Sequence, residues 1–230
     1  MDLIVQSLPA LLEASVLTLK LLLFSLAAGM CLAIPLAILR VQKSPLLWRP
    51  VHWYIYFWRG TPLLVQLFLV YYGLAQFEFV RNSFVWPALR SPFWCALITM
   101  SLHTTAYTAN ILRGGIEGVP HGEVEAARAI GMSGLLLYRR IILPRAFRLA
   151  IPAYGNEIIG MLKGSALAST VTLLELTGMA RKIVAATYAP YEIFVTAGLI
   201  YLAITFVVTR LIHLLEYRLN PHLRPLPRQG

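Results

Sequence analysis

The sequence has little charge. Of its 230 residues, 13 % are Asp, Glu, Lys or Arg, whereas 58 % are hydrophobic. A soluble domain typically carries about twice that share of charged residues, because it has to cover its surface with them. The deficit excludes an ordinary soluble protein and indicates a chain that lies largely within a membrane.

The chain also lacks the motifs of common enzymes. It contains no GxxxxGK[ST] loop for ATP phosphates, and no HExxH or GxSxG pattern. Asp2 is its only aspartate, so a metal site built on paired aspartates has no ligands. We therefore expect no catalytic residue, no metal site and no cofactor in this chain.

Cysteine is scarce as well. Cys31 and Cys95 both lie inside apolar runs, without the spacing of metal ligands and without an adjacent base. They are expected to be packing residues. The N-terminus has no basic region ahead of its apolar run, so it does not match a signal peptide and is expected to remain as a first helix.

What the chain does have is long apolar stretches. A helix needs about 20 apolar residues to cross a bilayer. Five stretches approach or exceed that length, and they cover residues 13–39, 60–77, 91–112, 149–174 and 193–213. The sequence thus predicts an all-α membrane protein with five transmembrane helices within a domain of residues 13–215. Residues 175–192 would form a short surface helix outside.

The basic residues indicate the orientation. Fourteen of the twenty Lys and Arg fall in residues 40–59, 113–148 and 210–228, each beside an apolar run. Lys and Arg are enriched in loops on the cytoplasmic side, so this placement favours a membrane over a nucleic acid as their surroundings. It places the N-terminal segment 1–12 outside and the tail 216–230 inside. Residues 40–59, also rich in Trp and Tyr, are expected at the inner membrane surface.

Polar groups within the spans mark a candidate site. Glu157 lies nine residues after Arg148, which is about 13 Å of helix. His103 precedes Arg113 by ten residues and lies at a similar depth. A stripe on one helical face contains His103 together with Thr99, Tyr107 and Asn110. A polar translocation site near the membrane centre would need such groups, because a charge facing lipid is costly.

Plainer interpretations remain open for these residues. Glu157 could pair with Lys163 or His103 only to hold helices together. Asn110 fits both a gate lining and helix packing, and Lys163 could extend to the outer interface.

The most distinctive stretch is residues 121–147, HGEVEAARAIGMSGLLLYRRIILPRAF. Its composition predicts two short helices joined at Gly131, the second ending before Pro144. A polar helical interruption between two apolar spans indicates a surface that is presented to a partner.

This stretch resembles the EAA loop of the integral-membrane permease subunits of ATP-binding-cassette importers. The pattern is Glu-Ala-Ala, three residues, Gly, nine residues and then Ile-x-Leu-Pro, and here it comprises Glu125, Ala126, Ala127, Gly131, Ile141, Leu143 and Pro144. The likeness continues in FWRGTPLLVQ, in AYTANILRGGIEGVPHGEVEAA and in the stretch from Pro152 to Thr170. These segments are similar to permeases for polar amino acids, in particular the histidine/lysine/arginine and octopine/nopaline branch.

The resemblance implies a type I importer permease fold in a bacterial inner membrane, with the N-terminus in the periplasm and the C-terminus in the cytoplasm. Its EAA segment would be the coupling helix that docks on a cytoplasmic ATPase. The implied partners are an ATPase dimer that binds the ATP, a second permease subunit or a second copy, and a periplasmic solute-binding protein. Two positions depart from the family pattern: Asn110 stands where many relatives have Glu, and His103 where many have Asn.

The expected function is import of an amino acid, of basic type or an opine, with hydrolysis left to the partner ATPase. Glu157 would pair with a cationic side chain of the substrate. The residues expected to bind substrate are Thr99, His103, Tyr107, Asn110, Asn156 and Glu157. The alternatives are an ion-coupled secondary transporter that uses Glu157 as its carrier, and a structural membrane scaffold without transport.

Overall fold

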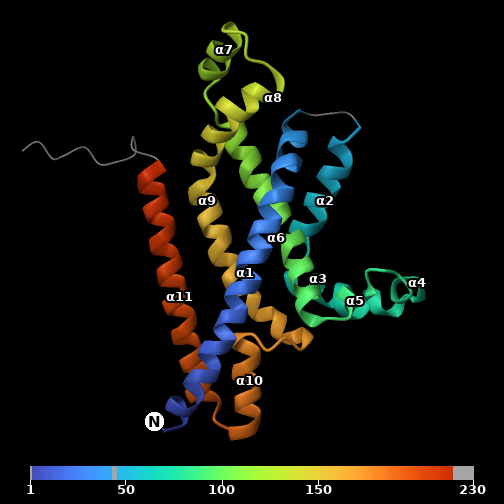
Figure 1. The fold of residues 1–230 in the computed structure, drawn as a ribbon, viewed down its shortest axis with the longest axis vertical. Coiled ribbons are helices and arrows are strands. Elements are labelled where there is room, and N and C mark those ends of the chain that lie inside the picture. The colour runs from blue at the N-terminus through green and yellow to red at the C-terminus, as the bar shows by residue number, and fades with distance from the viewer. Residues whose placement is uncertain (1, 43–45, 220–230) are drawn as a thin grey trace, which may run out of the picture.

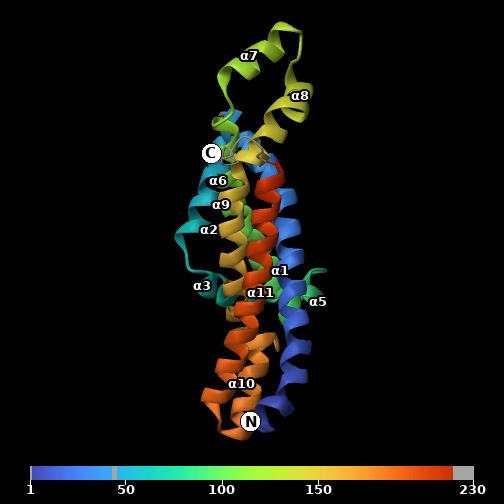
Figure 2. The ribbon, with the colours of Figure 1, turned by 90° about the vertical axis from the view of Figure 1, so that its left-hand side faces the viewer.

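The computed structural model describes residues 2–42 and 46–219, and over these ranges the chain is helical without a strand. The predicted tail beyond residue 219 and Lys43 of the first basic patch lie outside the described residues. The long helices run side by side along the longest axis of the molecule, with α7 at one end and α10 at the other (Figures 1 and 2). We call these the α7 end and the α10 end.

The first helix, α1 (Asp2–Gln42), has 41 residues and is therefore about 60 Å long. The apolar run predicted only its part from residue 13, and the structure continues the helix back to Asp2. It packs closely along α6 (Pro92–Glu117). The close approach depends on Gly29, because a Cβ atom there would collide with Thr104. Small residues allow such contacts between membrane helices.

The chain before the second predicted span is helical. Within residues 40–59, which were expected at the inner membrane surface, the structure has a helix, α2 (Trp48–Gly60), which packs against α6. The Tyr54 hydroxyl donates to the Leu102 carbonyl at 2.7 Å and ties the two helices together. After the break at Thr61 and Pro62, the chain resumes as α3 (Leu63–Phe68), a π-helical turn (Leu69–Gly73) and a 3₁₀ turn (Leu74–Gln76).

Two short helices, α4 (Glu78–Arg81) and α5 (Trp86–Leu89), form an arm that extends sideways from the bundle (Figure 1). Pro92 then starts α6. Helix α6 lies in the middle of the molecule, in contact with α1, α2, α3 and α9. Its Ser and Thr side chains face these neighbours, and Thr99, Thr104, Thr105 and Thr108 are buried. Such residues are typical of helix interfaces within a membrane.

The EAA segment forms the tip of the α7 end (Figure 2). It consists of α7 (His121–Ala129), a corner, α8 (Gly134–Leu137) and a π-helical turn (Tyr138–Ile142). Gly131 has φ +85°, which supports the predicted glycine corner. Pro144 does not end the second helix as predicted, because the π turn leads directly into α9 (Leu143–Gly164), where Pro144 lies in the first turn and needs no N–H donor.

At the opposite end, a 3₁₀ segment (Ser165–Val171) follows α9 and leads to α10 (Leu176–Thr187) and α11 (Pro190–Leu219). The helix α10 lies within residues 175–192, where the sequence predicted a short helix. By length and hydropathy, α1 and α11 are each able to cross a membrane, and the bent pair formed by Gly134–Val171 and Leu176–Thr187 would add a third crossing if it acts as one span.

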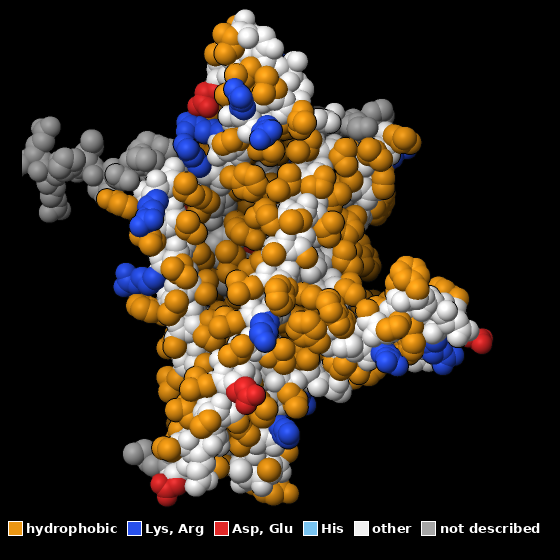
Figure 3. Space-filling view, viewed as in Figure 1, with side chains coloured by type: hydrophobic (Ala, Val, Ile, Leu, Met, Phe, Trp, Pro, Cys, Tyr) orange, Lys and Arg blue, Asp and Glu red, His pale blue; other side chains and the backbone are white. Residues whose placement is uncertain are grey.

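The core is divided into three clusters along the long axis. One joins α1, α2, α6 and α9 beneath the tip, one joins α1 and α3 to the first half of α6 and the end of α9, and one joins α1, α10 and α11. Outside the core, hydrophobic side chains cover much of the bundle surface and Lys or Arg gather near the α7 end (Figure 3). Of the long helices α1 and α11, α11 is the more exposed, and its Leu199, Leu202 and Phe206 are each more than half exposed.

Candidate substrate pocket

One buried side chain stabilises the break between α2 and α3. Gln66 is 2 % exposed, and its amide nitrogen donates to the carbonyls of Trp58 and Thr61 at 2.9 and 3.0 Å. These carbonyls belong to the end of α2, where the last turn of a helix has no N–H partners of its own. The Gln66 amide oxygen lies 2.8 Å from His103 Nδ1 on α6. One amide thus stabilises the break and fixes His103.

A pocket of about 350 Å³ lies directly at this break. It is formed between the start of α3, the middle of α6 and the end of α9. Its lining residues are Thr61, Pro62, Leu63, His103, Tyr107, Glu157, Gly160, Met161, Gly164 and Leu167. The volume is within the range of small-molecule sites. Broken helices beside a pocket are typical of transporter binding sites within membranes.

Glu157 is the charged group that α9 contributes to the pocket. Its Oε1 accepts a hydrogen bond from the Thr104 hydroxyl at 2.9 Å. In the part of the chain that the structure describes, it forms no ion pair. Neither pairing considered from the sequence is present: Lys163 is exposed, and His103 contacts Gln66 instead. A carboxylate oxygen can accept further bonds, so this side chain retains capacity for a cationic ligand.

Tyr107 forms one wall of the pocket. Its hydroxyl donates to the Arg59 carbonyl at 3.5 Å, and the Arg59 guanidinium stands 5.2 Å from the centroid of its ring. The His103 and Tyr107 rings lie 4.8 Å apart. The wall therefore consists of two aromatic rings and one cation.

The structure brings together His103, Tyr107 and Glu157 but leaves the other three candidates apart. Thr99 is fully buried and donates to the Cys95 carbonyl at 2.7 Å. Asn156 is exposed and does not line the pocket. Asn110 lies farther along α6 toward the α7 end, and its amide oxygen accepts from Arg40 at 3.3 Å.

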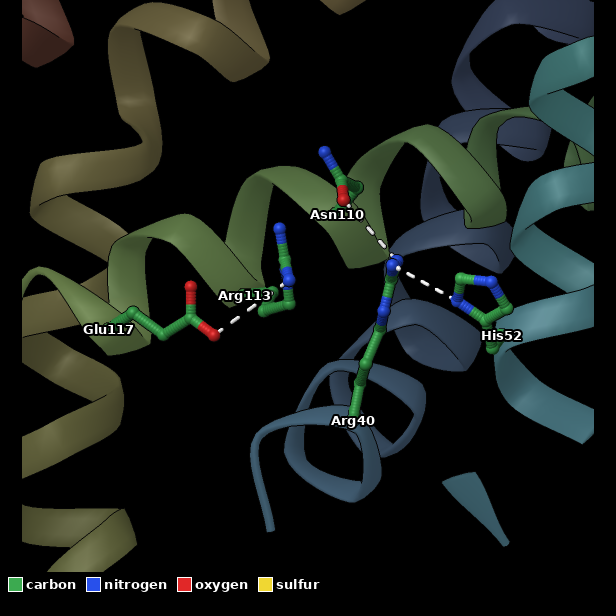
Figure 4. Close-up of polar contacts among 5 residues, drawn as sticks. All are labelled: Arg40, His52, Asn110, Arg113 and Glu117. Atoms are coloured by element: carbon green, nitrogen blue, oxygen red, sulfur yellow. Dashed lines mark hydrogen bonds and ion pairs between the residues drawn. The ribbon is translucent and has the colours of Figure 1, made fainter. Parts of the chain in front are cut away.

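Arg40 is the centre of a second polar cluster near the α7 end. Figure 4 shows its guanidinium between Asn110 on α6 and His52 on α2, with Arg113 and Glu117 farther along α6. The His52 contact is 3.5 Å long, and Arg113 lies 3.9 Å from Glu117. A second pocket, of about 310 Å³, adjoins this cluster and is lined by Arg40, His52, Ile55, Tyr56, Arg59 and Gly60.

The predicted coupling residues surround the tip. Glu125 and Ala126 are exposed on α7, whereas Ala127 is buried beneath them. An ion pair of 3.0 Å between Glu123 and Arg145 ties α7 to α9. Gly131, Ile141, Leu143 and Pro144 follow along the corner and the return helix. Large apolar side chains remain exposed there, with Ile130 at 75 % and Leu135 at 82 %.

Sequence reasoning missed three residues of these sites, namely Gln66, Thr104 and Arg40. An amide within an apolar stretch was a usable signal for Gln66, because buried polar groups require partners. Thr104 and Arg40 gave no such signal, since their roles depend on contacts between distant helices.

The fold is all-helical with long apolar helices, and a broken helix and a half-buried carboxylate line a pocket between α3, α6 and α9. Residues 28–221 match the model for the binding-protein-dependent transport system inner membrane component, and the chain belongs to this family. Its members are permease subunits of importers and carry no ATPase of their own.

Particular relatives refine this class. The chain is 49 % identical over 224 residues to the nopaline transport system permease protein NocM of Agrobacterium fabrum, covering 97 % of this chain and 93 % of the relative. It is 44 % identical over 210 residues to the histidine/lysine/arginine/ornithine transport system permease protein HisM of Escherichia coli. This match covers 91 % of this chain and 88 % of the relative. The crystal structure of an amino acid ABC transporter with histidines matches with a TM-score of 0.82 at 34 % identity, covering 93 % and 96 %.

Proposed function

We propose that this permease subunit moves a basic amino acid or an opine across a bacterial inner membrane, and that the pocket at the α2–α3 break binds the substrate. The observation that carries the proposal is Glu157, a carboxylate that faces a pocket and has, among the described residues, Thr104 as its single hydrogen-bond donor. The names of the relatives agree, because nopaline, histidine, lysine, arginine and ornithine all offer a basic group.

Each side chain of the pocket has a role in this proposal. Glu157 pairs with the cationic end of the substrate, where a charge-assisted hydrogen bond is strong because water is largely excluded. The Tyr107 and His103 rings line the pocket and pack against the aliphatic part of the substrate. Gln66 holds both the helix break and His103 in place, so it is a positioning residue.

The tip of the α7 end transmits the motion of the ATPase to the helices that form the pocket. The exposed Glu125 and Ala126, with the apolar Ile130 and Leu135 beside them, form the surface on which a cytoplasmic ATPase docks. The Glu123–Arg145 ion pair and the continuous π turn connect this surface to α9, which carries Glu157. Closure of an ATPase dimer would move the tip and α9 together and change access to the pocket.

The proposal includes five crossings. Helices α1, α6 and α11 run toward the α7 end, whereas α2–α3 and α9 run back (Figure 1). The α7 end is then cytoplasmic and the N-terminus periplasmic. Helix α6 is long enough to cross a membrane, but its Ser, Thr and His residues lower its mean hydropathy below that of α1 and α11. The partners are a second permease, an ATPase dimer that binds ATP, and a periplasmic binding protein. The chain itself needs no cofactor.

Uptake by proteoliposomes tests the proposal. The complete transporter should accumulate arginine only when its binding protein and ATP are both supplied. Uptake that persists without the ATPase and collapses with the proton gradient would instead establish ion-coupled transport. Absence of transport by every combination of subunits would establish a scaffold.

Charge reversal at the tip tests the coupling surface. Glu125→Lys should reduce ATP-driven uptake at least tenfold and weaken co-purification of the ATPase, because it places a cation on the docking surface. Arg181→Glu, a charge reversal at the α10 end, is the matched control and should leave ATPase retention unchanged. Normal co-purification and uptake with Glu125→Lys would contradict this role.

A further inference from the structure

The second pocket, beside Arg40, contains more positive than negative charge. Arg59 and Arg113 lie within electrostatic range of Arg40, as does the acid Glu117, and Arg59 is also within range of Glu157. Glu117 is 52 % exposed and 3.9 Å from Arg113, so it neutralises little of this charge. Among the described residues, the pocket therefore has unbalanced positive charge near the end of the bundle core.

The partners of Arg40 do not supply the missing anion. Asn110 offers a neutral amide oxygen, and His52 accepts only when its Nδ1 carries no proton. The Arg40 Nε atom is buried and has no partner among the described residues. A half-buried guanidinium with neutral acceptors and an unused N–H matches the geometry of a site for a carboxylate, which Arg binds through two parallel hydrogen bonds.

This pocket adjoins the substrate pocket. Arg59 and Gly60 line the one, whereas Thr61 and Pro62 line the other. The partition between them is the Arg59–Tyr107 contact, in which the cation stands over the ring. Along α6, Asn110 lies seven residues beyond His103, which corresponds to about 10 Å. That distance is comparable to the length of one extended basic amino acid.

We propose that the Arg40 pocket is a carboxylate subsite on the cytoplasmic side of the substrate pocket, which holds the α-carboxylate of the transported amino acid. The inference rests on the proposed function, because it requires the cationic end of the same molecule to lie near Glu157. The two subsites have opposite charge, as an amino acid with a basic side chain requires. Arg59 and Arg113 strengthen the subsite, and the substrate spans the two pockets when the Arg59 side chain moves away from the Tyr107 ring.

Arginine and agmatine provide the test, since agmatine is arginine without the α-carboxylate. Equilibrium binding of both is measured on the complete transporter in nanodiscs, without nucleotide or binding protein. Arg40→Gln should weaken arginine binding about tenfold or more and leave agmatine binding unchanged, because a hydrogen-bonded charge pair is lost only with arginine. Arg40→Lys should weaken arginine binding less than Arg40→Gln does, since lysine keeps the charge but not the forked geometry of the guanidinium.

Controls separate this site from other effects. Arg81 is exposed on the arm, and Arg81→Gln should change the binding of neither arginine nor agmatine. If Arg40→Gln does not assemble, Arg113→Gln should give a smaller loss, about threefold, again for arginine alone. Glu157→Gln should weaken both ligands.

Two results would overturn the carboxylate subsite while the proposed function stands. One is an equal loss of arginine and agmatine with Arg40→Gln. The other is no loss of either ligand combined with release of anionic phospholipid from the purified complex, which would make the pocket a lipid headgroup site. If Glu157→Gln leaves both ligands unchanged, or if the unaltered transporter binds neither, the proposed function fails first and the subsite with it.

Discussion

Two carboxylates within the bundle, the half-buried Glu157 and the fully buried Glu175, differ in how many partners the protein supplies. Glu175 at the α10 end is 0 % exposed and accepts from the backbone N–H groups of Thr177 and Gly178 at 3.0 and 2.9 Å. It also accepts from the hydroxyls of Tyr201 at 2.9 Å and Thr18 at 3.3 Å. Glu157 accepts from Thr104 and faces a pocket.

The difference separates a structural acid from a binding acid. Glu175 caps the start of α10 and joins it to α1 and α11, so its lone pairs are occupied by the fold. Glu157 keeps acceptor capacity that the protein does not use. A buried charge needs compensation, and where the fold does not provide it, a ligand is the natural source.

The largest expected effect is on stability, at Glu175. Glu175→Gln replaces acceptor lone pairs with an amide NH₂ that faces other donors, so it should reduce the free energy of unfolding by about 3 kcal/mol or more. The melting temperature of the purified transporter, followed by tryptophan fluorescence, should fall clearly. A melting temperature equal to that of the unaltered protein would show that Glu175 is not the structural acid of the pair.

Glu157→Gln should impair transport and leave stability nearly unchanged, which is the opposite of the effect expected for Glu175→Gln. The melting temperature should change little, because Thr104 can still donate to the amide oxygen. Uptake of arginine should fall roughly 30-fold or more, since a desolvated charge pair with the substrate contributes about 2–5 kcal/mol. Uptake of citrulline, the neutral analogue of arginine, serves as the control. Equal losses for both substrates would leave only a helix-packing role for Glu157.

Gln66 is expected to have an intermediate effect on the pocket. Gln66→Leu removes the donor to the α2 carbonyls and the partner of His103, so the pocket should lose its geometry. Arginine affinity should fall about tenfold, with a loss of stability of about 1–2 kcal/mol from the unpaired carbonyls. Gln76→Leu, on an exposed site of the following turn, is the matched control. Unaltered affinity in Gln66→Leu would separate the helix break from substrate binding.

The smallest effects compare one donor of each acid. Thr104→Val removes the one donor to Glu157 that the described residues supply, and it should change arginine affinity about threefold with little effect on melting. Thr18→Val removes one of four donors to Glu175 and should cost about 1 kcal/mol of stability without changing affinity. If both variants changed the same quantity, the distinction between the two acids would not hold.

The sequence predicted the coarse fold because apolar runs and basic patches report directly on helices near a membrane. It also predicted Gly131 as a corner, since only a local conformation was required there. It did not predict α2, because the Trp and Tyr of residues 48–58 are as typical of a membrane surface as of a helix packed on α6. It placed the end of a helix at Pro144, where a π turn accommodates the proline instead.

Prediction of the site was limited in a similar way. His103, Tyr107 and Glu157 share a depth that counting along a helix can estimate, and the structure places all three around one pocket. Asn110 lies on the same stripe but contacts Arg40, since α1 and α2 converge on α6 at that level. Periodicity locates a face of one helix, whereas the neighbour on that face depends on the packing of the others.

The most direct test of the Glu157 pocket is protection of a cysteine placed inside it. Gly160 lines the pocket, and a Cβ atom there would meet nothing within 4 Å, so Gly160→Cys adds a thiol without displacing a neighbour. Cys31 and Cys95 are replaced by alanine, and modification by a small methanethiosulfonate reagent is timed in the complete transporter. The account predicts that arginine slows modification and that adding Glu157→Gln abolishes this protection. Absence of protection by arginine, or protection that persists with Glu157→Gln, would contradict it.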